Sequence, residues 1–564
     1  MARSSISMVV AGSGGSGAMS AGAVLLRAAA HAGYYGLMTQ LFGPQVRGGE
    51  SAALVTVSTA PIEAQPDRYD LFVALDWDKV DQFAAEVPLD ETTVIIADPA
   101  VGPVTPGVAK CKGRVVNFPM QGGHGKRVNM FAAGAVATLL GVSEVDLKAA
   151  VAAVFSDKGA AVIAANVDSA QSGAQAAAAL TLNLRLDPPN PAPRWLISGN
   201  QALALGALRG GVRFVGCYPI TPATDLVEWL APHLMQLGGR LVLGEDELAS
   251  INMALGASYG GTPSMTVTSG PGFSLMAETL GLAVAAEIPL VLIDVMRAGP
   301  STGIASKTEQ SDVNLAIYGQ HGDAPHVVLA PMSATDCVNT AEYAVYVAES
   351  LQVPVIVLSD QTLGQASTVI DPPTARPAPL KRRTNGAAAG TPLFKRYALG
   401  GDAVTPMPLP GTPGHQWVAE GLTHNEVGIP ASGAGMHVAQ INKRAKKIAR
   451  FDSGSQWGQS WGKGDTVVLA FGSTVGPVRE AARRLAANGR PIRVIGLRVL
   501  APLPMEKLAR ALDGARRIIV VEQNHSAQLY HHLVGQKAIP PSAESVARPG
   551  PLPFRPSEIA SYVV

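Results

Sequence analysis

Residues 215–225 read Val-Gly-Cys-Tyr-Pro-Ile-Thr-Pro-Ala-Thr-Asp, and they complete an apolar run that begins at Gly211. The run predicts a buried strand that stops at Pro219, because a proline nitrogen cannot donate to a ladder. Pro222 suits the first position of a following helix, with Thr221 as its N-cap. This junction predicts a hydroxyl and free N–H groups at the carboxyl edge of a parallel sheet, where open α/β sheets bind ligands.

Two similar junctions follow along the chain. Residues 264–268 predict a strand that breaks at Ser-Gly-Pro-Gly, residues 269–272, and continues into an apolar helix. Residues 288–295 predict a further strand, which leads into Arg297 and a Gly/Pro-rich loop that ends at Gly303. Three loops are therefore expected to meet at one edge of a doubly wound sheet.

The composition predicts several packed α/β domains. The chain has 564 residues, of which 47% are hydrophobic and 15% charged, with 60 Gly and 42 Pro. This balance suits large cores and substantial buried interface with other chains. The net charge of +1 gives no electrostatic case for nucleic acid or membrane partners. No apolar run approaches the ~20 residues that span a bilayer.

The three cysteines, Cys111, Cys217 and Cys337, lie far apart in the sequence, without a CxxC pair. This chain alone therefore cannot ligate an iron–sulfur cluster or build a cysteine-based zinc site. The histidines show no ligand spacing either, so no metal site is expected. Isolated cysteines without a signal peptide predict a reducing cytoplasm.

Proline-rich segments and strand patterns divide the chain into parts. The expected parts are a first α/β domain at 1–187, a second at 194–370 with the three junctions, a connection at 371–464, a third α/β domain at 465–540 and a tail at 541–564. Within the connection, residues 437–450 predict a basic helix with a solvated face.

A glycine-rich turn, Gly-Ser-Gly-Gly-Ser-Gly at 12–17, follows the first predicted strand. The positions of Gly12, Gly14 and Gly17 are close to the G-x-G-x-x-G turn that cradles phosphate at a helix N-terminus. The ribose-binding acid expected ~20 residues later is missing, because Glu50 is the first acidic residue of the chain. NAD is therefore disfavoured, and a structural turn or another phosphate ligand remains open.

Three acidic residues open a predicted helix at 244–257. They would complement the helix dipole, which is the simplest interpretation. However, Glu247 shares the i, i+4, i+7 and i+8 positions with Ile251, Ala254 and Leu255, which places its carboxyl on the buried stripe. An inward carboxyl could share a proton with a ligand nitrogen.

Motifs along nearly the whole chain resemble those of the 2-oxoacid:ferredoxin oxidoreductases, in the form whose gamma-type domain is fused ahead of the alpha-type domains. The motifs are GSGGSG at 12–17, FGPQVRGGES at 42–51, YPITP at 218–222, EDELASI at 245–251, TSGPGFSLM at 268–276, RAGPSTG at 297–303, KTEQSD at 307–312 and EQNHSAQL at 522–529. Ser16 stands where the family usually has Gln.

The resemblance implies a multidomain α/β fold with a gamma-type domain, a doubly wound pyrimidine-type domain that binds thiamine diphosphate, and a transketolase C-terminal-like domain. The family oxidatively decarboxylates a 2-oxoacid, transfers the acyl group to coenzyme A and passes electrons to ferredoxin. The resemblance also implies a beta subunit that carries Mg²⁺ and a [4Fe–4S] cluster and shares the coenzyme in an (alpha-beta)2 assembly.

The resemblance also assigns residues to roles. Glu247 would bond the aminopyrimidine N1′, while Arg297 and Thr221 would hold the 2-oxoacid. The coenzyme would further contact Tyr218, Pro219, Ile220, Ser269 and Gly270. Contacts with coenzyme A or with another subunit would come from Gly12, Gly14, Gly17, Arg47, Glu522 and Asn524.

The favoured reaction is conversion of 2-oxoglutarate to succinyl-CoA, or the reverse reductive carboxylation, because the fused two-subunit form resembles that branch. Pyruvate or a broad substrate range stays open. A thiamine enzyme without a redox partner is disfavoured, since the chain lacks a GDG…N diphosphate motif and carries a gamma-type domain. A non-catalytic scaffold is disfavoured because Thr221, Glu247 and Arg297 are all present.

Overall fold

The computed structural model describes residues 3–43, 49–121, 127–182, 184–374, 382–385 and 393–564. The chain divides into two compact units, one formed by residues up to 198 with 365–373 and 555–561, the other by the rest. Both are α/β, which confirms the multidomain α/β class predicted from the sequence. Among the described residues, no helix is both long and apolar enough to cross a bilayer.

An eight-stranded sheet lies at the centre of the first unit, in the order β6-β5-β4-β1-β3-β2-β14-β7. The strands are β1 (Ser5–Ser13), β2 (Tyr35–Phe42), β3 (Glu50–Ser58), β4 (Leu71–Ala74), β5 (Val94–Ala97), β6 (Arg114–Asn117), β7 (Trp195–Ser198) and β14 (Ser367–Ile370). The helices are α1 (Ala18–His31), α2 (Pro106–Ala109), α3 (Val128–Leu140), α4 (Glu144–Val154) and α5 (Ala160–Ala176). The last helix of the chain is α17 (Pro556–Val563).

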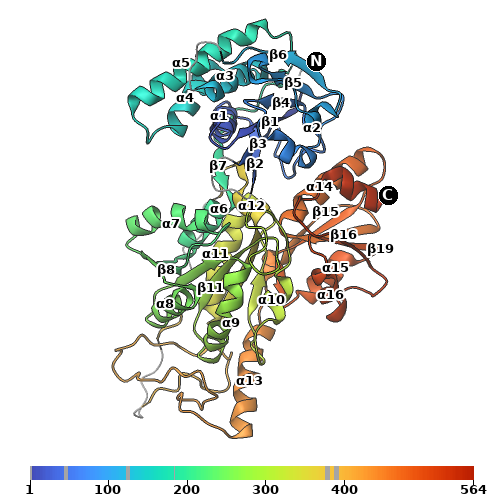
Figure 1. The fold of residues 1–564 in the computed structure, drawn as a ribbon. Helices are drawn as coiled ribbons and strands as arrows, with labels where there is room; N and C mark the ends of the chain where they lie inside the picture. The colour runs from blue at the N-terminus through green and yellow to red at the C-terminus, as the bar shows by residue number, and fades with distance from the viewer. Residues whose placement is uncertain (1–2, 44–48, 122–126, 183, 375–381, 386–392) are drawn as a thin grey trace. The chain divides into compact units, whose positions relative to one another are not determined.

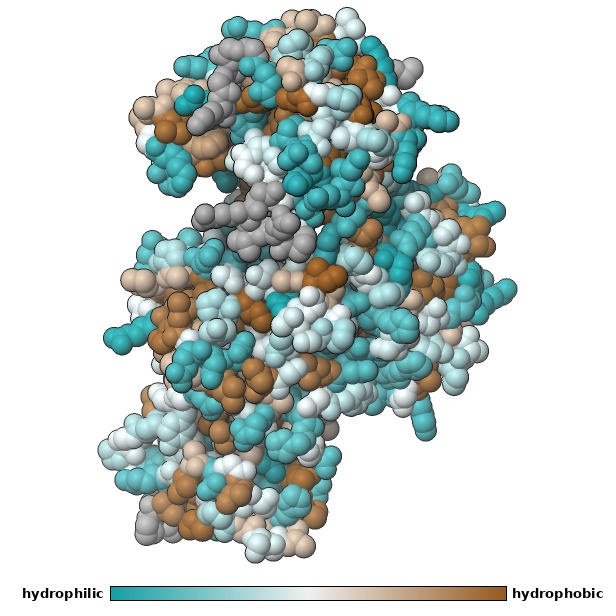
Figure 2. Space-filling view, viewed as in Figure 1, coloured by the Kyte–Doolittle hydropathy of each residue, from teal (hydrophilic) through white to brown (hydrophobic). Residues whose placement is uncertain are grey.

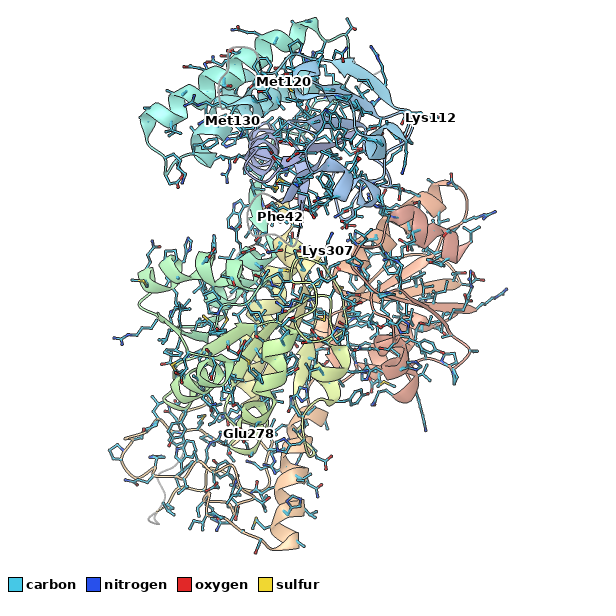
Figure 3. The ribbon with its side chains drawn as sticks, viewed as in Figure 1. Phe42, Lys112, Met120, Met130, Glu278 and Lys307 are labelled. Carbon is cyan, nitrogen blue, oxygen red and sulfur yellow. The ribbon has the colours of Figure 1, made fainter. Side chains whose placement is uncertain are left out.

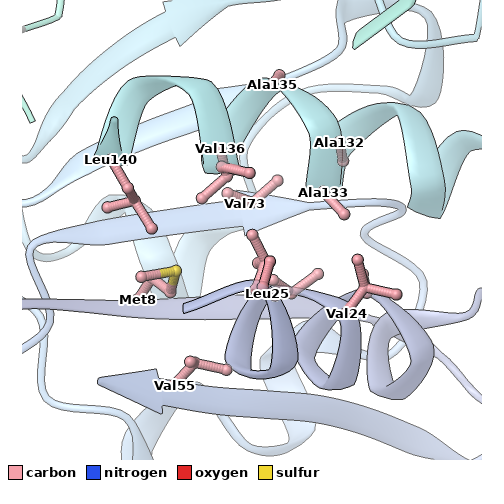
Figure 4. Close-up of a cluster of buried hydrophobic side chains, with 14 of the residues drawn as sticks. Met8, Val24, Leu25, Val55, Val73, Ala132, Ala133, Ala135, Val136 and Leu140 are labelled. Carbon is pink, nitrogen blue, oxygen red and sulfur yellow. The ribbon is translucent and has the colours of Figure 1, made fainter. Parts of the chain in front are cut away.

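The core of this unit lies between the sheet and helices α1 and α3. Met8 of β1 and Val73 of β4 pack against Leu25 of α1 (Figure 4). Met120 and Met130, marked in Figure 3, are fully buried in the same cluster. Burial of such side chains contributes roughly 1.5–3 kcal/mol each, which stabilises the helices on the sheet.

Strands β7 and β14 belong to this sheet, although the sequence analysis places both in the second domain. β14 pairs antiparallel with β2 and with β7. The Tyr35 hydroxyl donates to the Asp371 carboxylate at 3.0 Å, and the Arg194 guanidinium lies 4.0 Å from the centroid of the Tyr35 ring. β14 and β2 lie more than 300 residues apart in the sequence, and β14 and β7 about 170, so local periodicity does not reveal these pairings.

The second unit contains a seven-stranded sheet in the order β18-β12-β13-β11-β10-β8-β9. Its strands are β8 (Phe214–Cys217), β9 (Arg240–Leu243), β10 (Ser264–Thr268), β11 (Leu290–Met296), β12 (Val327–Leu329), β13 (Pro354–Asp360) and β18 (Val499–Ala501). Its helices are α6 (Gly199–Gly210), α7 (Thr224–Gln236), α8 (Glu247–Tyr259), α9 (Gly270–Ala285), α10 (Val313–Tyr318), α11 (Ala334–Leu351) and α12 (Gln361–Gln365). All of these strands run parallel except β18.

A second, five-stranded sheet completes the unit in the order β15-β17-β16-β19-β20. Its strands are β15 (Gly458–Gly462), β16 (Thr466–Phe471), β17 (Arg493–Leu497), β19 (Arg517–Glu522) and β20 (Glu544–Ala547), and its helices are α14 (Val475–Ala487), α15 (Met505–Leu512) and α16 (Gln528–Gly535). β20 pairs parallel with β19, so this domain extends into the predicted tail.

The buried Gln310 side chain joins the two parts of this unit. Its Nε2 donates to the Phe471 carbonyl at 2.9 Å, and its Oε1 accepts from the Gln523 N–H at 3.0 Å. The Asn524 amide donates to the Gln310 carbonyl at 3.1 Å. The loop that follows β11 is therefore bonded to the ends of β16 and β19.

The predicted connection packs closely on the second unit, and α13 (Ala434–Ala449) is part of it (Figure 1). The prediction of a solvated basic face is wrong at Lys443 and Lys447. Both side chains are buried, one helical turn apart. Lys443 Nζ lies 2.6 Å from the Glu287 carboxylate, Lys447 also pairs with it, and Arg396 lies at 3.8 Å. Burial raises the pKa of Glu287, but these cations outweigh it and lower the pKa to about 2.

We expect Glu287→Gln to destabilise the chain by ~3–5 kcal/mol, because it leaves buried cations without a counter-charge. The free energy of unfolding from a denaturant titration at pH 7 measures the effect. Glu426→Gln is the control, since Glu426 forms an exposed pair with Lys395 and such pairs contribute at most ~1 kcal/mol. Equal losses in both variants would contradict the stabilising role of the buried cluster.

Candidate functional site

Three parallel strands bring their carboxyl ends to one edge of the seven-stranded sheet. Met265 of β10 pairs with Val215 of β8 on one side and with Val291 of β11 on the other. The strands end at Cys217, Thr268 and Met296. The three loops consequently start from the same edge, as the sequence predicts.

The helix that follows the first loop begins later than predicted. α7 begins at Thr224, not at Pro222, and no side chain caps it. The N–H groups of Ala223 and Thr224 both donate to the Ile220 carbonyl, so a turn precedes the helix. Thr221 is exposed and is not a cap, so within the described residues its hydroxyl has no hydrogen-bond partner and is free for a ligand.

Glu247 opens α8 but does not cap it. The Asp246 carboxylate is the cap and accepts from the Ala249 N–H at 2.7 Å. The Glu247 side chain is only 9% exposed, and no described residue donates to its carboxylate. Helix capping therefore accounts for Asp246 and leaves Glu247 available to a ligand atom.

The second loop places glycines against two carboxyl groups at the start of α9. A Cβ on Gly272 would lie 2.8 Å from Glu247 Oε1, and one on Gly270 would lie 2.7 Å from Asp312 Oδ2. Ser269 precedes the helix, and its buried hydroxyl has no partner among the described residues. Only glycine lets the backbone approach both acids this closely.

The third loop carries Arg297, which is 8% exposed. Its Nη1 donates to the Thr221 carbonyl at 2.6 Å, which links the third loop to the first. Its buried Nε has no partner within the described part of the chain. Burial lowers the pKa of this guanidinium, and the nearby Asp312 and Asp294 oppose that shift.

Arg297 and Asp312 line a cavity of about 360 Å³ at this edge. Its other lining residues are Gly270, Pro271, Ser274, Ala298, Gly299, Pro300, Ser301 and Thr302. The cavity thus combines a buried guanidinium with small polar side chains and the first turn of α9. Such a site favours a carboxylate or another small anion.

Two acids that the sequence analysis did not single out lie beside Arg297. Burial and the charge and hydrogen bond of Asp312 raise the pKa of Asp294 well above its usual range. Burial and the charge of Glu309 raise the pKa of Asp312 to about 6. A signal existed for both, since Asp294 interrupts an apolar strand and Asp312 ends the KTEQSD motif.

The remaining predicted coenzyme contacts lie at the same edge. Tyr218 and Pro219 are exposed and Ile220 is half-buried, so the first loop presents them toward solvent. Cys217 at the end of β8 is fully buried, and burial raises the pKa of its thiol to about 11. A thiol whose pKa is so far above neutral pH stays protonated and is therefore not a nucleophile.

The resemblance assigns Glu522 and Asn524 to contacts with coenzyme A or with another subunit. Both are fully buried. The Glu522 carboxylate accepts from the N–H groups of Leu529 and Tyr530 and from the Asn524 amide, at 2.6–2.9 Å. These contacts hold the start of α16, so the two side chains have a structural role.

The glycine-rich turn of the first unit is also closely held. A Cβ on Gly12 would lie 2.6 Å from Ser16 Oγ, and Gly17 has a φ of 83°. The Ser13 N–H and hydroxyl donate to the Asp76 carboxylate, which places negative charge beside the turn. These contacts favour the structural alternative. Gly14 donates to the Gly49 carbonyl.

Arg47 lies outside the described residues. Contact of this turn or of Arg47 with coenzyme A stays a prediction. Among the described residues, no group of three or more His, Cys, Asp or Glu side chains is placed to hold a metal ion.

Three family models match the chain. "Pyruvate flavodoxin/ferredoxin oxidoreductase, thiamine diphosphate-binding" matches residues 205–443, "Pyruvate ferredoxin/flavodoxin oxidoreductase" matches 7–176, and "Pyruvate:ferredoxin oxidoreductase core domain II" matches 464–539. The first range contains the whole edge described above and reaches into α13.

Relatives agree with these models. The chain is 36% identical to the 2-oxoglutarate oxidoreductase subunit KorA of Mycobacterium tuberculosis, over 65% of this chain and 56% of that protein. It is 34% identical to the 2-oxoglutarate synthase subunit KorA of Methanothermobacter marburgensis, over 66% of this chain and 98% of that protein. The match thus spans little more than half of the first relative.

A solved structure is similar over the full length. It is the 2-oxoglutarate:ferredoxin oxidoreductase from Magnetococcus marinus with 2-oxoglutarate, coenzyme A and succinyl-CoA bound. The TM-score is 0.89 at 34% identity, and the match covers 100% of this chain and 99% of that one.

We expect Gly272→Ala to destabilise the chain by ~1–3 kcal/mol, because the new methyl group would overlap Thr268 Oγ1 and the Glu247 side chain. Gly256→Ala in α8 is the matched control, since its Cβ would meet no atom within 4 Å and alanine favours helix. Thermal unfolding of both variants measures the difference. A Gly272→Ala variant as stable as the control would disprove the close approach.

Proposed function

The chain belongs to the 2-oxoacid:ferredoxin oxidoreductase family, and from that premise we propose that it is the fused gamma-alpha subunit of an enzyme that oxidatively decarboxylates 2-oxoglutarate. Coenzyme A is the acyl acceptor and ferredoxin the electron acceptor. The observation that carries the proposal is that two largely buried charged side chains, Glu247 and Arg297, lie at one edge of parallel strands, and that Arg297 Nε has no partner among the described residues. The choice of 2-oxoglutarate rests on the named relatives.

The residues around Glu247 fit the pyrimidine half of thiamine diphosphate. The Glu247 side chain is largely buried and no described residue donates to its carboxylate, so a ring nitrogen that shares a proton can pair with it. When bound, the coenzyme supplies the nucleophilic carbon that attacks a 2-oxo group. Glu247 would hold the proton at the ring nitrogen, and Tyr218, Ile220 and Ser269 would contact the ring.

Arg297 is the group that holds the substrate carboxylate. Its guanidinium is buried, keeps unused donors and lines the 360 Å³ cavity, so a bidentate pair with a carboxylate fits it. The exposed Thr221 hydroxyl completes the contact, because Arg297 is bonded to the carbonyl of the same residue. Together they orient the 2-oxo group toward Glu247's side of the edge.

A partner subunit completes the site in this proposal. Large apolar side chains are exposed near the carboxyl edge, namely Tyr218, Leu243, Leu248, Leu275 and Ile304. Figure 2 shows hydrophobic residues in small groups among hydrophilic ones on the face that it displays. We assign Mg²⁺, the diphosphate and the [4Fe–4S] cluster to that beta subunit, in an (alpha-beta)2 assembly.

We expect Glu247→Gln to abolish turnover while assembly with the beta subunit persists, because an amide cannot share the proton. The assay mixes the chain with its beta subunit and follows viologen reduction that requires both a 2-oxoacid and coenzyme A. Glu245→Gln is the control, since Glu245 is exposed two residues away. Near-normal turnover of Glu247→Gln, or no activity in any reconstituted complex, would refute the proposal.

We expect Arg297→Ala to lower kcat/KM for the 2-oxoacid by a factor that corresponds to ~2–4 kcal/mol of lost binding free energy, as for truncation of one partner of a desolvated charge pair. Arg297→Lys should recover part of this loss, because it keeps the charge without the planar fork. KM for coenzyme A serves as the internal reference and should stay within a few-fold. An unchanged KM and kcat for the 2-oxoacid would remove Arg297 from the binding role.

A further inference from the structure

Asp294 and Asp312 form a carboxyl pair that the proposed function does not use. Asp294 is fully buried in β11, where it pairs with Thr268 of β10 in the sheet register. Asp312 precedes α10, and its Oδ2 is buried without a partner among the described residues. Neither oxygen of Asp294 has a donor there either. Two ionised carboxylates in contact, both short of donors, would be strongly destabilising.

The contact therefore holds one proton. Asp294 is fully buried and Asp312 is only half-buried, so the neutral form is favoured most strongly at Asp294. The negative charge is left on Asp312, which lines the cavity together with Arg297. In this state the guanidinium and one carboxylate balance each other, although they form no ion pair within 4 Å.

An anionic substrate upsets this balance. A carboxylate that binds Arg297 enters the same cavity that Asp312 lines, so two negative groups face one cation. Glu309 also lies near Asp312 and adds to the repulsion; its carboxylate accepts from the N–H groups of Gly299 and Gly550. On the α9 side, the helix N-terminus at Gly270 contributes only its dipole.

We infer that the Asp294–Asp312 pair takes up a proton when the 2-oxoacid binds, so that a neutral Asp312 donates a hydrogen bond to the bound carboxylate. This inference rests on the proposed function of Arg297. It makes Asp312 a positioning and specificity residue that admits one carboxylate and couples its binding to pH.

The sign of the effect follows from the free pair. Burial and Glu309 raise the pKa of Asp312 to about 6, and a bound anion raises it further. Above that pH, binding must recruit a proton from solvent, and affinity falls as protons become scarce. KM for the 2-oxoacid should therefore rise with pH, by up to about tenfold per unit, the limit for uptake of one proton.

The test measures KM and kcat for 2-oxoglutarate between pH 6 and 9 in the assembled complex. In the unaltered enzyme KM should rise above about pH 6, while kcat changes much less. In Asp312→Asn the amide donates at every pH, so KM should vary by less than about twofold per unit. Asp323→Asn, an exposed acid beyond α10, is the matched control and should keep the rise.

Two outcomes would overturn proton uptake by the pair. A pH-independent KM in the unaltered enzyme is the first, and it needs no variant, so the test still works if Asp312→Asn misfolds. An Asp312→Asn complex that keeps the full rise also overturns it, even if Arg297→Ala behaves as expected. Failure of the proposed function is separate, because Arg297→Ala would then leave KM unchanged at every pH.

Discussion

The parallel register of β8, β10 and β11 is the constraint on which the candidate site depends. Because Met265 pairs with both Val215 and Val291, the three strands end side by side and their loops share one edge. A slip of one residue in β11 would exchange the two faces of that strand and carry Asp294 to the opposite side. Every residue of β10 and β11 is buried, so burial on both faces holds this register.

Two buried charge clusters in the same unit show how structural and functional electrostatics differ. Glu287 is surrounded by Lys443, Lys447 and Arg396, and these cations keep its pKa low. Asp294 and Asp312 lie near Arg297, whose charge does not outweigh their burial, and their pKa values rise. A buried carboxylate that is surrounded by cations stabilises the packing around it. Buried acids with too few hydrogen-bond donors are instead sites where a proton or a ligand can bind. Arg297 and Asp312 of the second cluster line a cavity.

The sequence predicted those parts that depend on local pattern. Apolar runs broken by Pro and Gly located β10 at its observed bounds and β8 and β11 within a few residues, and helical spacing placed Glu247 on a buried face. The pairing of β14 with β2 and the burial of Lys447 were missed, since both depend on contacts between distant segments. A turn at Ile220 stands in place of the expected Thr221 cap, because the Ile220 carbonyl accepts the hydrogen bonds of the first free N–H groups.

The site within this chain is chemically one-sided. In the proposed function it offers an acid for a ring nitrogen, a guanidinium for a carboxylate and a shared proton, and no cluster among the described residues could hold a divalent metal. A diphosphate beside Asp312 would need further positive charge, which the proposal assigns to the beta subunit. Leu248 on α8 and Leu275 on α9 are large apolar side chains that are exposed in this chain. A partner that covered them would also exclude water, and in a drier cavity the charges of Arg297 and Asp312 would act more strongly on a bound substrate.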